Sequence, residues 1–316
     1  MGEFELIERF FKRPTGRNPL GVGDDCALLQ PAPGMQLAIS TDLLVEGRHF
    51  LSTVDPARLG HKALAVNLSD LAACGASPLA FSLALALPRV DEKWLEGFAR
   101  GLFALADSHS CELVGGDTTQ GPLAICITVF GELPAGGALL RSGAGAGDDI
   151  YVSGNLGDAR LALDVFRGKL SVPAQVFEAA RLRLEQPAPR VALGLALRGI
   201  ATSAIDISDG LAGDLGHLLK QSGVGARIDS VTAMGLLAAP SLPEDTVLDL
   251  VLSGGDDYEL LFTAPPSASA AVQAAAASTG TPVTRIGTIQ AEPGLQLVDR
   301  SGAVLMRRFA SFDHFA

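Results

Sequence analysis

A strict alternation of large and small side chains over residues 79–87 most constrains the fold. Leucine and phenylalanine occupy the odd positions of this segment, and alanine and serine occupy the even positions. Because side chains of a β-strand point alternately to its two faces, this period predicts a strand whose small-residue face allows another layer to approach closely. Apolar residues at helical spacing follow from Asp91 onward. Strand and helix patterns interleave in this way along the chain, which predicts a mixed α/β fold.

A second apolar run, at residues 37–39, ends abruptly in Ser40, Thr41 and Asp42. A strand that ends in two hydroxyl groups and a carboxylate presents oxygen ligands from a rigid edge, which suits a hard cation or a metal-bound phosphate. Residues 26–29 are predicted as a strand that forms a hairpin with residues 37–41. A short strand at residues 112–114 is expected to lead into the glycine pair that follows it.

Other carboxylates also lie beside glycine, serine or threonine near the ends of apolar segments. Singly, each has an ordinary explanation as a turn residue, a solvated helix position or a helix N-cap. Burying several carboxylates close together costs much free energy unless cations neutralise them. We therefore predict one convergent acidic site that holds magnesium. The motifs are Gly23-Asp24-Asp25, Asn67-Leu68-Ser69-Asp70, Gly115-Gly116-Asp117-Thr118 and Asp206-Ile207-Ser208-Asp209-Gly210.

The chain of 316 residues is long enough for two domains, and its 48% hydrophobic content supports a sizeable core. A segment rich in glycine and alanine at residues 134–147 suggests a boundary, so we predict domains at 1–140 and 141–316. No apolar run approaches the ~20 residues that span a bilayer, and the N-terminal residues are acidic. We therefore expect a soluble, cytoplasmic protein.

The net charge of −11, from 35 acidic and 24 basic residues, argues against nucleic acid or an anionic membrane as the main partner. If the ligands are phosphates, bound magnesium would have to neutralise them. The four cysteines are isolated in the sequence and are expected to be reduced core residues rather than a zinc site or disulfides.

The common signatures of nucleotide sites and hydrolases are missing: the sequence contains no G-x-x-x-x-G-K-[ST], G-x-S-x-G or H-E-x-x-H. His217 lies among leucines on a predicted helix and is expected to be structural. His49, in a predicted loop after Asp42, could either be structural or hydrogen-bond a phosphate or substrate. Arg141 could be a solvated linker residue or could clamp a nucleotide phosphate.

These motifs resemble, in order, those of the thiamine-monophosphate kinase family, which belongs to the superfamily of aminoimidazole ribonucleotide synthetase and selenophosphate synthetase. The resemblance extends over nearly the whole chain. It is carried by residues 21–29, 40–50, 67–76, 115–119, 206–211 and 253–260, which include Ser-Thr-Asp-Leu-Leu at 40–44 and Gly-Gly-Asp-Asp-Tyr-Glu-Leu at 254–260.

The resemblance implies two α/β domains, N-terminal sheets that pair across a homodimer, and transfer of a phosphoryl group from ATP to thiamine phosphate. It implies that several magnesium ions are held by Asp25, Thr41, Asp42, Asp70, Asp117, Asp206 and Asp209, of which Asp42, Asp70 and Asp209 are predicted to be catalytic. Gly116, Asp117, Arg141 and Ser208 would contact ATP, and His109 stands where the family commonly has a tyrosine near the base. His49, Asp256 and Phe312 would face thiamine phosphate, with Asp256 in place of the family's usual glutamate.

Two other functions remain open from the sequence. One is another ATP-dependent enzyme of the same superfamily that acts on a different acceptor. The other is a non-catalytic module that senses a divalent cation or a nucleotide, which would bind metal without consuming ATP.

Overall fold

The computed structural model describes residues 2–239, 242–307 and 309. The chain divides into two compact units, one formed by Met1–Leu71 and Ala76–Gly136 and the other by Ala72–Gly75 and Gly137–Ala316. The main division falls between Gly136 and Gly137, within the segment rich in glycine and alanine. Each unit contains a sheet and several helices, so the predicted mixed α/β class is confirmed.

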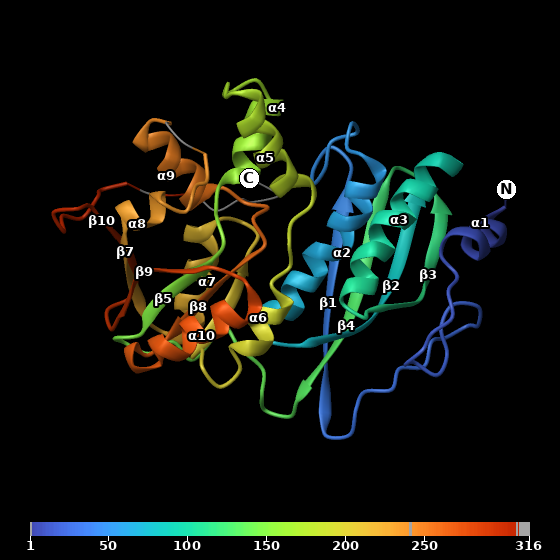
Figure 1. The fold of residues 1–316 in the computed structure, drawn as a ribbon, viewed down its shortest axis with the longest axis horizontal. Coiled ribbons are helices and arrows are strands. Elements are labelled where there is room, and N and C mark those ends of the chain that lie inside the picture. The colour runs from blue at the N-terminus through green and yellow to red at the C-terminus, as the bar shows by residue number, and fades with distance from the viewer. Residues whose placement is uncertain (1, 240–241, 308, 310–316) are drawn as a thin grey trace. The chain divides into compact units, whose positions relative to one another are not determined.

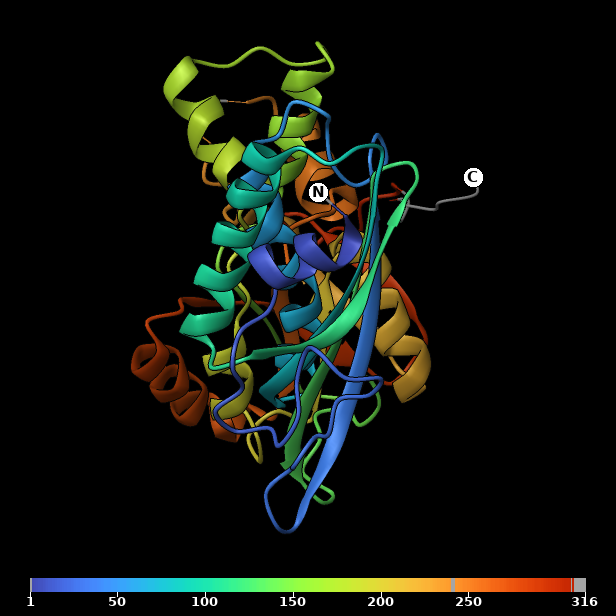
Figure 2. The ribbon, with the colours of Figure 1, turned by 90° about the vertical axis from the view of Figure 1, so that its right-hand side faces the viewer.

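The first unit is a four-stranded sheet with helices on one face (Figures 1 and 2). The strand order is β1-β4-β2-β3; β2 and β3 run parallel, and the other neighbours run antiparallel. Helices α2 and α3 cover one face, and α1 contacts β3 and α3. The elements are α1 (Glu3–Phe10), β1 (Met35–Val45), α2 (Pro56–Ala73), β2 (Ser77–Leu87), α3 (Glu92–Ser108), β3 (Glu112–Gln120) and β4 (Ala124–Pro134).

The two faces of this sheet differ in exposure. Leu83 and Leu85 on β2 and Ile127 on β4 are buried on the face toward the helices. On β1, alternate residues of the opposite face remain exposed although they are apolar: the exposed fractions are 41% for Leu37 and 61% for Ile39. An exposed apolar strand face of this kind is unusual for a monomer, because soluble proteins seldom leave large apolar patches uncovered.

Helices α2 and α3 approach each other closely at glycine positions. A Cβ atom on Gly101 of α3 would lie 1.8 Å from the carbonyl oxygen of Ala57, and one on Gly60 of α2 would lie 2.1 Å from that of Phe98. Both distances are far below van der Waals contact, so only glycine allows the two backbones to pack at this separation.

The second unit is built around a six-stranded sheet of order β10-β7-β9-β5-β8-β6. Helix α7 contacts both edge strands, β6 and β10, and so lies across the sheet. The elements are β5 (Asp149–Ser153), α4 (Asp158–Phe166), α5 (Ala174–Glu185), α6 (Val191–Ala196), β6 (Ser203–Ile207), α7 (Leu211–Ser222), β7 (Gly225–Asp229), α8 (Ser230–Met234), α9 (Glu244–Ser253), β8 (Glu259–Ala264), a 3₁₀ turn (Pro266–Ala268), α10 (Ser269–Thr279), β9 (Val283–Gln290) and β10 (Gly294–Val298).

Two local predictions were wrong or incomplete, and one pair of elements was missed. Residues 26–29 do not form a strand or a hairpin with β1; they make one isolated bridge, between Leu20 and Leu28, while Ala27 and Leu29 pack against buried residues of β2 and β3. Side-chain packing, not a backbone ladder, holds this segment. The short strand predicted at 112–114 continues through the glycine pair to Gln120, and β7 with α8 was not predicted.

The close approach of α2 and α3 leads to a stability prediction. We expect Gly101→Ala to destabilise the protein by about 1–3 kcal/mol, because the added methyl group must push the backbones apart and this outweighs the gain in helix propensity. Gly216→Ala on α7 is the matched control, since a Cβ atom there meets no atom within 4 Å. The check is the urea midpoint of each variant; equal midpoints for the two variants would contradict the packing argument.

Candidate functional site

The end of β1 and one face of α2 form the first group of predicted ligands. The Ser40 hydroxyl donates to Asp70 Oδ2 at 2.5 Å, and the Asp42 backbone N–H donates to Asn67 Oδ1 at 3.1 Å. Asn67 is buried, and its side-chain N–H donates to the Ala63 carbonyl at 3.0 Å, which fixes the amide orientation. Residues three apart share a helix face, so α2 presents Asn67 and Asp70 together to β1.

Neighbouring residues of β1 point to opposite faces of the sheet. Asp42 pairs in register with the buried Ile127, whereas Thr41 pairs with Thr128 and their hydroxyl oxygens lie 2.9 Å apart. Thr41 is exposed and Asp42 is partly buried. The Ser-Thr-Asp motif therefore directs the side chains of Ser40 and Asp42 toward α2 and the side chain of Thr41 toward the other face of the sheet.

Two histidines have defined surroundings in this unit. His49, in the loop after β1, accepts the Val45 backbone N–H at its Nδ1 atom, over 3.0 Å. This bond requires an unprotonated Nδ1 and fixes the ring at the end of the strand. His109 is the C-cap residue of α3, and burial, followed by the nearby His61, lowers its pKa. The lowered pKa favours the neutral form of His109.

A second group of predicted ligands lies around a cavity of about 990 Å³ in the first unit. Asp25, Gly116 and Asp117 all line it, from the segment before β1 and from β3. Residues of α1, including Phe4 and Ile7, form another wall. The volume falls within the range of about 300–1,000 Å³ typical of small-molecule sites.

The sheet separates these two groups. Asp42 pairs with Ile127 on β4, Ile127 pairs with Leu83 on β2, and Leu83 pairs with Gly116 on β3. Asp42 and Gly116 are therefore three strand spacings apart, at about 4.8 Å each. Asp42 thus lies on one edge strand and Asp117 on the other. Within residues 2–239, 242–307 and 309, no group of three or more His, Cys, Asp or Glu side chains is close enough to hold a metal ion.

The third group of predicted ligands lies at the end of β6 in the second unit. Asp206 is buried within the strand, and Ser208 and Asp209 form the turn before α7. The backbone N–H groups of Ser208 and Asp209 both donate to Asp214 Oδ2, each at 3.0 Å. The sequence did not single out Asp214, although an acidic residue in the first turn of a helix is a recognisable signal.

Asp214, in the first turn of α7, has a strongly perturbed carboxyl group. Burial, and then the neighbouring Asp209, raise the pKa of Asp214 to about 7, while the two backbone donors and Arg141 oppose the rise. The Arg141 carbonyl accepts the Ser222 hydroxyl at 3.0 Å, which attaches the segment after Gly137 to the end of α7. Arg141 therefore lies in the electrostatic environment of the Ser208–Asp209 turn.

Asp256 lies beside this turn. Its backbone N–H donates to the Ser208 carbonyl at 2.9 Å, and the Tyr258 hydroxyl donates to Asp256 Oδ1 at 3.1 Å. Of the predicted site residues, the second unit thus brings Ser208, Asp209 and Asp256 together. His217 is exposed on α7, and Phe312 lies outside the described residues.

Two of the four cysteines, Cys111 and Cys126, have the properties of neutral thiols, whereas the prediction that all four are core residues was wrong for Cys26, which is exposed. Burial, with Glu112 as a smaller contribution, raises the pKa of Cys111 to about 12, and burial followed by Asp42 raises the pKa of Cys126. A thiol whose pKa is raised is a poor nucleophile near neutral pH. The chemistry of these groups is therefore not that of a cysteine nucleophile.

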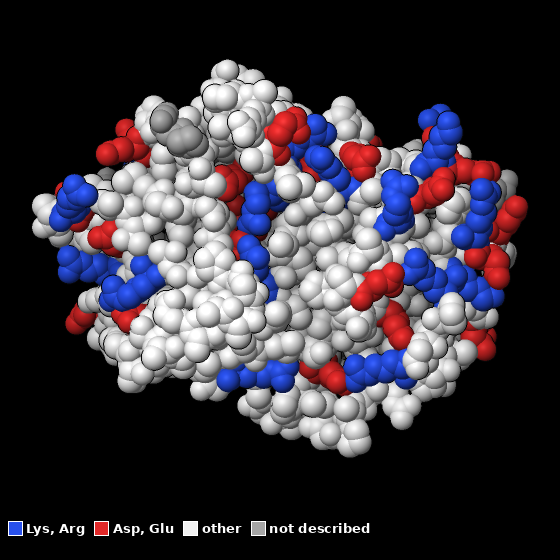
Figure 3. Space-filling view, in the orientation of Figure 1, with Lys and Arg blue, Asp and Glu red and all other residues white. Residues whose placement is uncertain are grey.

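Basic and acidic side chains are interspersed on the surface. On the face drawn in Figure 3, lysine and arginine residues that the structure describes form no continuous basic patch. Among the described helices, none combines the length and apolar character needed to cross a bilayer.

Comparison with known proteins gives two family matches. The models of the AIR synthase related protein N-terminal and C-terminal domains match residues 23–133 and 145–300. The thiamine-monophosphate kinase of Salmonella typhimurium is 48% identical over 323 residues, covering 100% of this chain and 98% of the relative. That of Haemophilus influenzae is 42% identical over 325 residues, covering 100% of this chain and 98% of the relative.

Solved structures agree with the sequence comparison. The crystal structure of thiamine-monophosphate kinase from Stenotrophomonas maltophilia has a TM-score of 0.84 and 43% identity, and the match covers 96% of each chain. The structure of AaThiL complexed with AMPPCP and TMP has a TM-score of 0.76 and 27% identity, covering 99% of this chain and 96% of that one. The chain belongs to the thiamine-monophosphate kinase family, within the AIR synthase related proteins.

Proposed function

We propose that this protein is a thiamine-monophosphate kinase, which transfers the γ-phosphoryl group of ATP directly to thiamine phosphate and releases ADP and thiamine diphosphate. The observation that carries this proposal is 48% identity, over the full chain, to an enzyme of that name. A relative of the same fold binds an ATP analogue and TMP in one complex. The carboxylates and hydroxyl groups of this chain are suited to such phosphorylated ligands when magnesium is present.

The oxygen-rich ligand set fits magnesium. This ion is commonly held by one or two carboxylates together with substrate phosphates and water, so it does not need a preformed cluster of three acidic residues. Bound magnesium would offset the repulsion between the two phosphorylated substrates. We assign Asp42, Asp70 and Asp209 to the catalytic ions, and Asp25, Thr41, Asp117 and Asp206 to further coordination.

The remaining roles follow the groups described above. Gly116, Arg141 and Ser208 are assigned to the ATP phosphates, and His109 to the neighbourhood of the base. His49, Asp256 and Phe312 are assigned to thiamine phosphate. Because Ser208 and Asp256 are joined by a backbone hydrogen bond, the proposed nucleotide and acceptor contacts of the second unit are mechanically coupled.

The chain supplies alignment rather than a strong base. The accepting atom is a phosphate oxygen that is already ionised at neutral pH, so no side chain has to remove a proton from it. This agrees with the neutral His109 and with the raised pKa values of the thiols. The rate enhancement then comes from holding two polyanions in line and from stabilising the charge that they share.

The direct test is ADP release by the purified protein in a magnesium titration, with and without thiamine phosphate. We expect ADP release that requires both the acceptor and magnesium, with thiamine diphosphate identified among the products. ATP consumption without thiamine diphosphate would point to another acceptor of the superfamily. Tight binding of magnesium and nucleotide without any turnover would favour a sensing module.

Two substitutions test the group at β1 and α2. We expect Asp42→Ala and Asp70→Ala each to lower kcat by about 10²–10³-fold, because each removes an oxygen ligand whose charge acts on the transition state. Both residues are partly exposed, so folding should be little affected. Asp107→Ala is the matched control, since Asp107 is exposed and pairs with Arg13 away from these groups. Near-native turnover of either site variant at saturating magnesium would contradict the assignment.

We also propose that the protein is a homodimer that works in the cytoplasm. Support for the dimer comes from the exposed apolar face of β1, where Leu37, Ile39 and Leu43 leave a surface that a second copy could cover. ATP and thiamine phosphate, as charged metabolites, are consistent with an enzyme inside the cell.

Substitution on this face tests the dimer. We expect Ile39→Glu to convert the protein from a dimer to a monomer in analytical ultracentrifugation, because a carboxylate would be buried without a partner in the interface. Val90→Glu, at a residue that is 46% exposed in the same unit, should leave the dimer intact. A wild-type protein that sediments as a monomer would refute the proposed dimer.

A further inference from the structure

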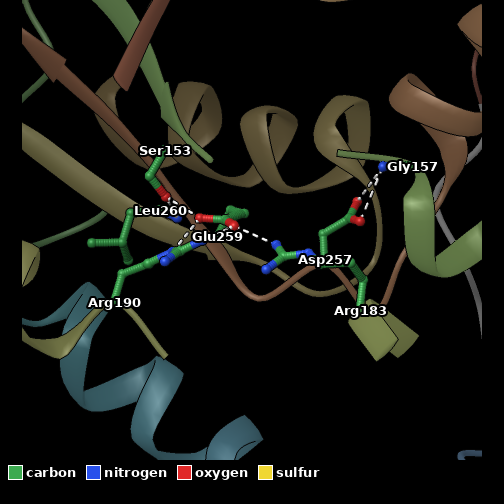
Figure 4. A network of polar contacts seen from close by, with 7 residues as sticks. All are labelled: Ser153, Gly157, Arg183, Arg190, Asp257, Glu259 and Leu260. Carbon is green, nitrogen blue, oxygen red and sulfur yellow. Dashed lines mark hydrogen bonds and ion pairs between the residues drawn. The ribbon is translucent and has the colours of Figure 1, made fainter. Parts of the chain in front are cut away.

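Two buried carboxylates alternate with Asp256 and Tyr258 where the chain enters β8. Asp257 and Glu259 are 4% and 0% exposed, whereas Asp256 and Tyr258 are partly exposed. The segment therefore alternates between residues directed into the unit and residues directed outward. Figure 4 shows the inward-directed pair with its partners.

Glu259 is held by two arginines and a serine. Arg190 donates to it through Nε at 2.6 Å and Nη2 at 2.5 Å, and Arg183 Nη2 donates to the same carboxylate at 2.5 Å. Ser153 completes the group, because its hydroxyl donates to Glu259 and accepts the Leu260 backbone N–H (Figure 4). Because two arginines donate to it, and Arg190 does so through two hydrogen bonds at once, the Glu259 side chain has one defined position.

Asp257 is fixed separately. Its two carboxylate oxygens lie 3.0 and 3.2 Å from the backbone nitrogen of Gly157, the N-cap residue of α4 (Figure 4). Burial raises the pKa of Asp257 well above its usual value, although the Gly157 N–H and Arg183 act in the opposite direction. Asp257 and Glu259 thus attach the same segment to α4 and to the arginines of α5 and the α5–α6 loop.

The backbone next to these anchors is strained. Asp256 has φ 65° and Tyr258 has φ 51°, in the left-handed region that residues with a Cβ atom rarely adopt. The N–H groups of both residues donate to the end of β6, to the carbonyl oxygens of Ser208 and Ile207 at 2.9 and 2.8 Å. A strained conformation of this kind persists only when its surroundings hold it, and the buried Asp257 and Glu259, each of which follows a strained residue, provide such a constraint.

We propose that Arg183, Arg190, Asp257 and Glu259 form a positioning network that holds Asp256 in its left-handed conformation for binding of thiamine phosphate. The proposal rests on the proposed function and on the role of Asp256 in it. The four residues do not themselves contact substrate in this scheme. They act through Asp256, and through the hydrogen bond that joins its backbone to Ser208.

Arg190→Lys tests the network because lysine keeps the charge but cannot reproduce the forked hydrogen bonds to Glu259. We expect the KM for thiamine phosphate to rise at least tenfold, and by more than the KM for ATP, which the network reaches only through the hydrogen bond between Asp256 and Ser208. Arg285→Lys is the matched control: Arg285 donates to the buried Asp149 at 2.6 Å in the same unit, away from Asp256. An unchanged acceptor KM in Arg190→Lys, or an equal rise in the control, would overturn the proposal.

A double-mutant cycle separates positioning from general loss of stability. If Arg190 acts through Asp256, then Arg190→Lys should change the acceptor KM less than twofold in an Asp256→Ala background. Fully additive effects of the two substitutions would overturn the proposal. If Arg190→Lys folds poorly, Ser153→Ala removes one neutral donor to the same carboxylate and should produce a smaller effect of the same kind.

Hydrogen exchange provides a readout that does not depend on the reaction. We expect the amides of Asp256 and Tyr258 to exchange at least tenfold faster in Arg190→Lys than in the wild type or in Arg285→Lys. Unchanged exchange would refute the network even if the enzyme is active. Wild-type protein that fails to phosphorylate thiamine phosphate would refute the proposed function instead, and the exchange result would still decide whether the network holds the loop.

Discussion

A carboxylate removed from water must be matched by cations or by N–H and O–H donors, and this requirement organises much of the structure. Glu259 satisfies it with Arg183, Arg190 and Ser153, all within the second unit. Asp214 satisfies it with two backbone N–H groups. These carboxyl groups fix loops through the hydrogen bonds that they accept. Asp70 accepts from the hydroxyl of Ser40, and this hydrogen bond orients its carboxylate beside the end of β1.

Carboxylates that fix loops through distant partners were harder to identify from the sequence than carboxylates at the ends of apolar segments. Hydrophobic periodicity identified most strands and helices, and it thereby showed which acidic residues lie near the ends of these elements. The family resemblance singled out Asp256, but the residue pattern alone did not show that Asp257 and Glu259 are buried, because the arginines that contact Glu259 lie 69 and 76 residues away. Asp214 was missed for a related reason: its role depends on accepting the N–H groups of the preceding turn.

Register could not be predicted either. Local sequence placed a strand near Asp42 and another before Gly115, but the order β1-β4-β2-β3 results from long-range pairing. That order puts Asp42 and Asp117 on opposite edges of one sheet. The failure at residues 26–29 has a similar origin, because Ala27 and Leu29 pack on a core formed by β2 and β3 and need no partner strand. Hydrophobic periodicity shows which side chains of a segment are buried, but it does not show which strands pair with that segment.

The charge of the protein limits how it can bind phosphorylated substrates. With a net charge of −11, the chain repels polyanions at long range, and Arg141 is the single basic residue assigned to the ATP phosphates. The same carboxylates that repel free ATP attract divalent cations, so the affinity for nucleotide depends on the cation that accompanies it. Magnesium-bound ATP carries less negative charge than free ATP, so under the proposed function the acidic motifs would favour the complex over free ATP. In this scheme the acidic composition and the phosphate chemistry of the family become compatible.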